Sequence, residues 1–189
     1  MKERCSRESN HKVLFLGELG RRKGCYDIPA VIEDVVKSIP DVKFILAGAG
    51  STQDEIAIKQ LIKEKGIEQN VEFPGWVRGN QKDKLLREAD VFFLPSYNEG
   101  MPMSILDAMG YGLPIVSTTV GGIPKIVHTE KNGFCFKPGN VMQMGKAIEL
   151  LLEDQRIEAS ISSFEIVQRG YSLEQHIEKL EECYKKAFE

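Results

Sequence analysis

The sequence lacks paired cysteines and long apolar runs. Its four cysteines, Cys5, Cys25, Cys135 and Cys183, form no Cys-x-x-Cys pair, so free thiols in a reducing cytosol are the simplest expectation. No apolar run approaches the roughly 20 residues that span a bilayer, and no signal-peptide core is present. We therefore expect a cytoplasmic protein, while peripheral association of the complete protein with a membrane is left open.

The sequence also lacks an excess of basic residues and any metal-binding pattern. Its 25 Lys and Arg stand against 28 Asp and Glu, a net charge of −3, whereas a nucleic-acid binder needs a basic face. The three histidines, His11, His128 and His176, are widely separated, and there is no Asp-x-Asp pair. The absence of GxxxxGK[ST] excludes a Walker phosphate loop. We expect no metal, no cofactor and no nucleic-acid partner.

What the chain has is an alternation of apolar strands and amphipathic helices, in a length of 189 residues that suits one domain. Strands are expected over residues 12–17, 43–48, 71–73, 91–95, 114–118 and 133–136. Helices are expected over 28–39, 54–66, 80–88 (capped by Asn80), 103–111, 141–153 and 172–188. This order predicts an α/β fold with a doubly wound, mostly parallel, Rossmann-like sheet. Polar, aperiodic residues 1–11 are expected to be a linker remnant or tail.

In such a sheet, ligands bind beyond the carboxyl ends of the strands. The loop GELGRRKG, residues 17–24, follows the first strand and carries Arg21, Arg22 and Lys23 just before a helix. Cations beside backbone amides suit a polyanion such as a diphosphate. A solvated basic turn is the equally weighted alternative.

The stretch NEGMPMSILD, residues 98–107, follows the strand at 91–95. Pro102 suits a first helical turn, whose free N–H groups and dipole favour an anion. Glu99 could accept hydrogen bonds from hydroxyls of a neutral ligand, and Asp107 from a vicinal diol such as a ribose. The alternative is an exposed turn acid and an acid on a helix surface.

Three other features are less specific. Gly121-Gly122 would permit a ligand to approach the backbone closely, but a plain turn explains the pair equally well. LAGAGSTQ, residues 46–53, begins a GxGxxG pattern, but Gln53 occupies the third glycine position and weakens a dinucleotide fingerprint. Trp76 is expected to serve packing rather than chemistry.

These motifs together resemble the C-terminal, donor-binding half of a GT-B glycosyltransferase of the retaining family 4 kind, over residues 12–188. The family signature ADVFxxPSxxEGxPxxxxEAMAxGxPVV stands here as ADVFFLPSYNEGMPMSILDAMGYGLPIV, residues 89–116. The family's GGIPxxV corresponds to residues 121–127 and its NGF to 132–134. Its opening Gly-Arg-Leu and Lys-Gly appear as Gly17-Glu18-Leu19 and Lys23-Gly24.

The resemblance implies a role for each site residue. Lys23 and Glu99 would be the catalytic pair: Lys23 neutralises the departing diphosphate without a metal, and Glu99 binds hydroxyls of the donor sugar. Asp107 would hold the ribose, and the loop 75–78 would lie near the nucleobase. The other donor-binding residues implied are Gly17, Arg22, Gly100, Met101, Pro102, Met103 and Ser104. The partner would be a nucleotide-diphosphate sugar, transferred to a glycan or lipid-linked acceptor.

Two departures and one absence qualify the resemblance. Glu18 replaces a family arginine, so we expect Arg21 or Arg22 to supply the second cation. Asp107 is one methylene shorter than the family's glutamate. The N-terminal acceptor domain is absent, so residues 12–189 would be half an enzyme, inactive alone, with the apolar stripe of helix 172–188 partly exposed. Alternatives are an epimerase, a phosphorylase, or a non-catalytic nucleotide-binding or interaction module.

Overall fold

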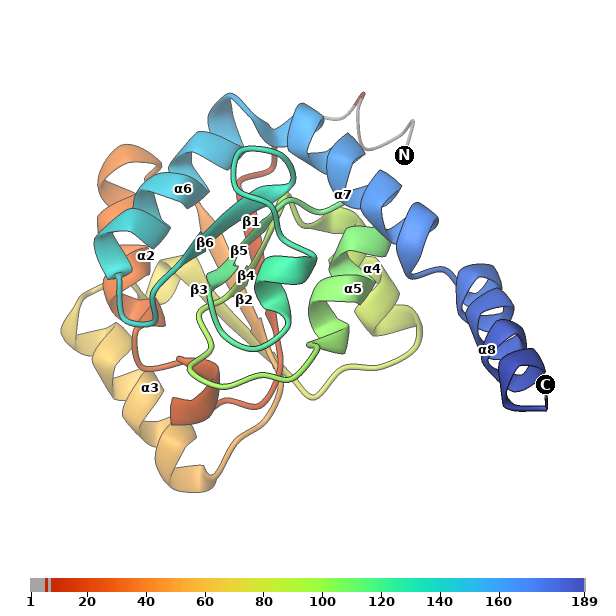
Figure 1. The fold of residues 1–189 in the computed structure, drawn as a ribbon. Helices are drawn as coiled ribbons and strands as arrows, with labels where there is room; N and C mark the ends of the chain where they lie inside the picture. The colour runs from red at the N-terminus through yellow and green to blue at the C-terminus, as the bar shows by residue number, and fades with distance from the viewer. Residues whose placement is uncertain (1–5, 7, 189) are drawn as a thin grey trace.

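A six-stranded parallel sheet separates two layers of helices (Figure 1). This computed structural model describes residue 6 and residues 8–188. The strands are β1 (Lys12–Leu16), β2 (Lys43–Ala47), β3 (Val71–Gly75), β4 (Val91–Leu94), β5 (Ile115–Thr118) and β6 (Gly133–Phe136). Their spatial order is β3-β2-β1-β4-β5-β6, which is the doubly wound Rossmann order. The structure therefore confirms the predicted α/β fold class.

The central strands are buried on both faces, as their uninterrupted apolar sequences predict. All four residues of β4 are buried, whereas the edge strand β3 alternates between half-buried and exposed residues. Phe44 of β2 and Phe93, which lies in β4, meet edge to face with ring centroids 6.5 Å apart. Burial of this aromatic and branched surface supplies the main stabilisation of the sheet.

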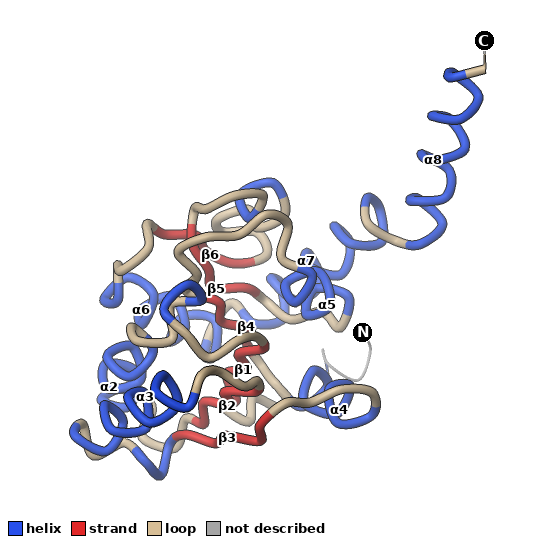
Figure 2. The backbone as a smooth tube through the Cα atoms, turned by 90° about the horizontal axis from the view of Figure 1, so that it is seen from below, coloured by secondary structure: helices blue, strands red, loops and turns tan. Residues whose placement is uncertain are grey.

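The helices lie in two groups, one on each face of the sheet (Figure 2). One group consists of α2 (Ile28–Ser38), α3 (Thr52–Glu64) and α6 (Val141–Glu153), and the other of α4 (Asn80–Glu88), α5 (Met103–Gly110) and α7 (Arg156–Gly170). Three single-turn 3-10 helices, η1 (Arg21–Lys23), η2 (Glu68–Asn70) and η3 (Ile123–Lys125), lie in the connections.

Two details of the helices differ from the prediction. Asn80 does not cap α4, because the preceding Gly79 is the N-cap and Asn80 is already helical. The sequence pattern also gave no indication of α7. Ser160 and Ser163 are fully buried on this helix and interrupt its apolar stripe, so the helical periodicity of hydrophobic residues is weak.

Asp90, which directly precedes β4, links the amino end of β4 to the amino end of β1. Its carboxylate is fully buried and accepts hydrogen bonds from the backbone N–H groups of Asn10 (2.9 Å) and Lys12 (3.1 Å). The guanidinium of Arg156, at the start of α7, lies 3.7 Å from the same carboxylate. The end of the expected tail is thus attached to the sheet, while residues 1–5 and 7 of that tail lie outside the described residues.

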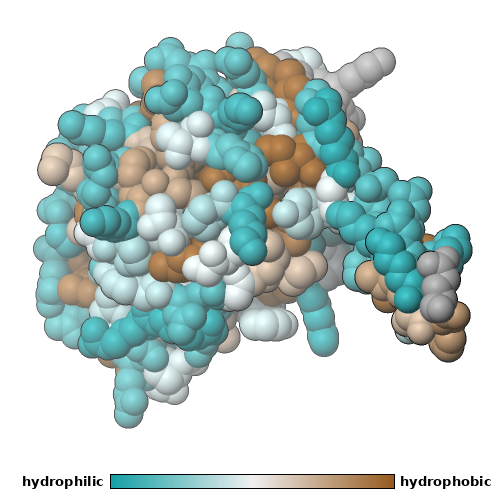
Figure 3. All heavy atoms as spheres, in the orientation of Figure 1, coloured by the Kyte–Doolittle hydropathy of each residue, from teal (hydrophilic) through white to brown (hydrophobic). Residues whose placement is uncertain are grey.

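The last helix, α8 (Leu173–Ala187), projects away from the sandwich (Figures 1 and 2). Its apolar stripe is exposed, as expected: Leu173 is 70% exposed and Tyr184 61%. In Figure 3, the side of α8 that faces the viewer is largely hydrophilic, and hydrophobic atoms lie along its lower side. In the described part of the chain, no helix combines the length and the apolar character that crossing a bilayer requires.

The Asp90 network generates a first prediction. Asp90→Asn removes the carboxylate beside a buried guanidinium, so we expect the free energy of unfolding to fall by about 3 kcal/mol in urea denaturation. The matched control is Glu165→Gln, which alters an exposed pair with Arg169 (3.1 Å) and should leave stability nearly unchanged. Equal effects of the two substitutions would contradict this role of Asp90.

Candidate functional site

The loops after β1 and β4 meet at the point where the strand order reverses. The backbone N–H of Tyr97 and the hydroxyl of Ser96 both donate to the carbonyl oxygen of Arg22, at 2.9 and 3.0 Å. These bonds fix the turn η1 against the loop that follows β4. This is the position at which an open α/β sheet binds its ligands.

Gly24 allows this close approach. Its φ of +73° lies in the left-handed region, and a Cβ on it would lie 1.9 Å from the carbonyl oxygen of Pro95. Any side chain at this position would therefore displace the turn from the end of β4. The glycine fixes the separation between the two loops, and with it the placement of the neighbouring Lys23.

The structure brings Lys23 and Glu99 together. The ammonium nitrogen of Lys23 lies 2.6 Å from Oε1 of Glu99, and the two side chains are only 14% and 6% exposed. The prediction placed the two residues at one edge of the sheet, and the ion pair shows that they are neighbours. A ligand that enters here meets a balanced pair of charges, and Glu99 and the ligand compete for the ammonium group.

Gly121 and Gly122 support Glu99 from the next loop. A Cβ on Gly121 (φ +55°) would lie 2.0 Å from the carbonyl oxygen of Glu99. The backbone N–H of Gly122 donates to the carbonyl oxygen of Gly100 at 2.6 Å. The close approach that this glycine pair permits is therefore made by the backbone of the adjacent loop, which favours the plain-turn interpretation.

The glycines of LAGAGSTQ also have a packing explanation. A Cβ on Gly48 would lie 1.7 Å from the carbonyl oxygen of Gly17, and one on Gly50 would lie 2.0 Å from that of Leu19. The loop after β2 thus supports the loop after β1 from the other side. The incomplete dinucleotide pattern reflects this contact between two loops.

An open pocket of about 170 Å³ lies next to Lys23, because Gly17 lines the pocket and a Cβ on Gly17 would lie 3.9 Å from Cδ of Lys23. Three residues of the expected donor site line it, namely Gly17, Ser104 and Asp107. Trp76, which is 69% exposed, also lines the pocket, so the expectation that it serves packing is wrong. A side chain that carries indole surface into solvent at a pocket is suited to stacking on a planar ligand.

Lys82 is the pocket residue that sequence reasoning missed. Its ammonium nitrogen lies 2.5 Å from Oδ2 of Asp107. No motif contains it, but the helical spacing offered a signal: Lys82 lies three and four residues before Leu85 and Leu86, on the side of α4 that faces the protein. When a lysine lies on the face of a helix that packs against the protein, its ammonium group must reach either an oppositely charged partner or a pocket that is open to solvent.

The remaining predicted residues are distributed around α5. Pro102 is its N-cap residue and is buried, while Gly100, Met101 and Met103 are exposed beside it. In the first turn of α5, the N–H of Ile105 donates to the carbonyl oxygen of Pro102 at 3.1 Å. Among the described residues, the N–H groups of Met103 and Ser104 have no backbone acceptor, so they are available to an anion at the carboxyl end of the sheet.

The two arginines have partners of their own. Arg22 pairs with Glu18 at 2.9 Å, both side chains being more than half exposed. The guanidinium of Arg21 lies 4.2 Å from the ring centroid of Tyr26. In this arrangement Lys23 is the cation of η1 that joins Glu99, whereas Arg22 is paired with Glu18.

Two ionisable neighbours of Lys23 remain neutral near pH 7. Burial raises the pKa of the Cys25 thiol to about 12. The hydrogen bond that the Tyr97 hydroxyl donates to Asp27 (2.8 Å) raises the pKa of Tyr97. Neither group adds a charge or a nucleophile to the site. Cys25, Cys135 and Cys183 are free thiols, and Cys5 lies outside the described residues.

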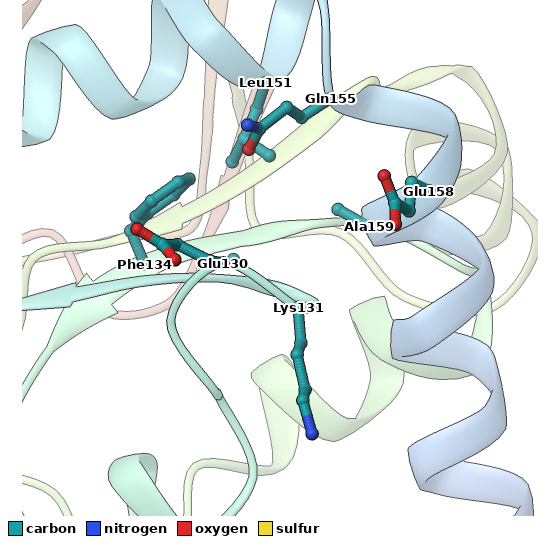
Figure 4. Close-up of a pocket in the computed structure, with 8 residues that line it drawn as sticks. Glu130, Lys131, Phe134, Leu151, Gln155, Glu158 and Ala159 are labelled. Atoms are coloured by element: carbon teal, nitrogen blue, oxygen red, sulfur yellow. The ribbon is translucent and has the colours of Figure 1, made fainter.

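A second, small pocket of about 40 Å³ lies at the opposite edge of the sheet, where β6 begins (Figure 4). Glu130 and Phe134 approach it from the β6 side, and Gln155 and Glu158 from the start of α7. None of the residues that were predicted for the donor site lines this second pocket. Within residues 8–188, no three His, Cys, Asp or Glu side chains are grouped so that they could hold a metal ion.

Comparison with known proteins decides the family. The sequence model of "Glycosyl transferases group 1" matches residues 2–165, most of the chain. The chain belongs to this glycosyltransferase family. A relative described as an uncharacterized glycosyltransferase, from Haemophilus influenzae, is 28% identical over 180 residues, which are 94% of this chain and 50% of the relative. The chain thus spans about half the length of this curated relative.

Solved structures of glycosyltransferases have the same fold. A point mutant of S. aureus TarM, in complex with Fondaparinux, α-GlcNAc-glycerol and UDP, has a TM-score of 0.82 and 26% identity, covering 92% of this chain and 35% of TarM. The C-terminal domain of a group 1 glycosyl transferase (LpcC) from Francisella tularensis has a TM-score of 0.79 and 20% identity, covering 88% of each chain. The latter shows likeness of fold alone.

The role of Gly24 can be tested against a second left-handed glycine. Gly24→Ala should lower the free energy of unfolding by about 3 kcal/mol, because backbone strain and a backbone clash combine. Gly66→Ala has a similar φ of +65° but no atom within 4 Å of the new Cβ, so only strain of about 1 kcal/mol is expected. Equal losses in urea denaturation would show that the contact with Pro95 is unimportant.

Proposed function

We propose that residues 12–189 form the donor-binding half of a retaining GT-B glycosyltransferase of family 4. The donor is a nucleoside diphosphate sugar, and the acceptor is a glycan or a lipid-linked sugar. A second, N-terminal Rossmann-like half outside these residues binds that acceptor, and the donor half is inactive without it. Support comes from the family membership and from the matched region, which spans half of the Haemophilus relative.

The pairing of Lys23 with Glu99 is the observation on which the proposal depends. The 2.6 Å contact places a cation and a hydroxyl acceptor together, next to the first turn of α5. A sugar diphosphate presents both an anion and neutral hydroxyls. A site for it needs a cation, free N–H groups and a carboxylate within a few ångströms of one another.

In the reaction, the bond between the anomeric carbon and the β-phosphate oxygen breaks and a bond to the acceptor oxygen forms. The acceptor hydroxyl loses its proton in this step, and an oxygen of the departing diphosphate takes it up. Negative charge develops on the departing diphosphate. Lys23 and the first-turn amides of α5 stabilise that charge, an electrostatic contribution that needs no metal and no other cofactor. Glu99 holds sugar hydroxyls so that the anomeric carbon stays oriented toward the acceptor.

The position of the nucleoside follows from the adjacent pocket. Asp107 accepts hydrogen bonds from the ribose diol, and Trp76 and Val77 lie beside the base. The remaining donor-site residues, Gly17, Gly100, Met101, Pro102, Met103 and Ser104, surround the sugar and phosphates. Arg22 contributes to diphosphate binding when it exchanges Glu18 for the ligand. UDP is the first nucleotide to test, because the similar TarM structure contains it.

The exposed stripe of α8 has a place in this proposal. Leu173, Ile177, Leu180 and Tyr184 are between 46% and 70% exposed. Burial of such side chains stabilises a contact by about 25 cal/mol per Å² of apolar area. We assign this stripe to the contact between the donor half and the N-terminal half.

Nucleotide binding tests the proposed function. UDP, GDP or ADP should raise the melting temperature; at one hundred times Kd the gain is about 2.7 kcal/mol, or roughly 5–10 °C. Lys23→Met should remove most of this rise, whereas the control Lys37→Met, an exposed lysine of α2, should retain it. If none of the three nucleotides binds the folded protein, the chain is a non-catalytic interaction module.

A second substitution separates the two roles of Glu99. Glu99→Gln removes the anion that competes for Lys23, so UDP should bind about three- to tenfold more tightly. The same change weakens the acceptor for sugar hydroxyls, so the affinity gained by adding the sugar should decrease. Isothermal titration with UDP and UDP-glucose, or with the corresponding GDP or ADP pair, measures both. Weaker binding of the free diphosphate would contradict competition between Glu99 and the ligand.

A further inference from the structure

Lys82 and Asp107 form an ion pair inside the pocket rather than on an open helix surface. Lys82 lies in the first turn of α4 and Asp107 lies on α5, 25 residues further along the chain. Their charged atoms are 2.5 Å apart, and both side chains line the pocket that also contains Gly17 and Ser104. The two side chains are 33% and 37% exposed, so a ligand can reach both.

Stability gives no sufficient reason for this pair. Half-exposed ion pairs contribute little to the free energy of folding. The neighbouring Lys84 pairs with Glu88 at 3.8 Å and remains 73% exposed, as is usual for a solvated helix face. Lys82 is directed instead to a carboxylate at the carboxyl end of the sheet, where ligands bind.

We propose that Lys82 and Asp107 together recognise the ribose of the donor, as a matched hydrogen-bond donor and acceptor, and so select ribonucleotides over 2′-deoxyribonucleotides. This inference rests on the proposed function, in which Asp107 faces the ribose. Lys82 becomes a specificity-determining residue of the same site. Its contribution is separate from the charge that Lys23 offers to the diphosphate.

The hydrogen-bonding capacity of the two groups fits a diol. An ammonium group has three N–H donors, and one is used on Asp107, so two remain for a ligand. A carboxylate accepts only, and Asp107 retains lone pairs on both oxygens after it accepts from Lys82. A ribose hydroxyl can donate to Asp107 and accept from Lys82 at the same time. The 2′-deoxy sugar has no oxygen at the 2′ position, so it loses both bonds there and keeps only those that its 3′-hydroxyl can make.

Lys82 also orients a short carboxylate. An aspartate reaches one methylene less far than a glutamate, so its direction decides which hydroxyl it meets. The 2.5 Å contact holds Oδ2 toward α4, and charge-assisted bonds of this kind have well-defined geometry. Oδ1 then remains for the diol.

Binding of ribonucleotides and 2′-deoxyribonucleotides tests the inference. The probes are UDP, GDP and ADP with their 2′-deoxy counterparts, and the readout is the fluorescence of Trp76, the single tryptophan of the chain, which lines the pocket. The wild-type protein should prefer the ribonucleotide by about tenfold or more. Lys82→Met should weaken the ribonucleotide about tenfold and its deoxy counterpart less than threefold.

Further variants separate recognition from charge. In an Asp107→Asn background, Lys82→Met should change affinity less than twofold, because the pair acts as a unit. Lys82→Arg should restore part of the ribose preference, and the control Lys84→Met should leave it unchanged.

Two outcomes overturn the inference while the proposed function stands. One is an unchanged ribose preference in Lys82→Met. The other is equal weakening of the ribo and deoxy forms, which would show that Lys82 acts only by long-range attraction to the diphosphate. Absence of nucleotide binding by the wild-type protein would refute the proposed function and this inference with it.

Discussion

The contact between the turn after β1 and the end of β4 is the constraint on which the rest of the site depends. Gly24 permits it sterically, and two hydrogen bonds to the carbonyl oxygen of Arg22 fix it. Lys23 extends from this turn, and its ammonium group ends on Glu99. The reversal of strand order, the left-handed Gly24 and these two hydrogen bonds together bring Lys23 and Glu99 into contact, although they are 76 residues apart in the sequence.

The resulting site contains two pairs of opposite charges, one in the pocket and one at the junction of the loops after β1 and β4. Lys23 pairs with Glu99, and Lys82 pairs with Asp107. Each pair contains one group suited to an anion or a lone pair and one group suited to hydroxyls. In the absence of ligand, the pairs hold the side chains in place and limit the reorganisation that binding requires. In the proposed donor site, Glu99 and Asp107 would occupy the lysines until the polar groups of the ligand replace them.

Much of this arrangement could be predicted from the sequence, because parallel strands bring their carboxyl ends to one edge of a sheet. The alternation of elements predicted the fold, and the loop motifs placed Lys23 and Glu99 at the same edge of the sheet, where the family resemblance implied a common role. The pairing of Lys82 with Asp107 was not predictable in that way, since it depends on how closely α4 and α5 approach. Trp76 was misassigned because its sequence neighbours do not report exposure, and α7 was missed because serines occupy its buried face.

The two ends of β4 carry different groups: a stabilising network at the amino end and the candidate site at the carboxyl end. Asp90, at its amino end, binds the chain entry and α7, whereas Glu99 follows its carboxyl end. A strand of this size spans about 13 Å, so the anchoring network and the ligand pocket share one strand without sharing atoms. Substitutions around Asp90 and Arg156 can therefore change the stability of the fold without touching the proposed donor site, which lies at the opposite rim of the sheet.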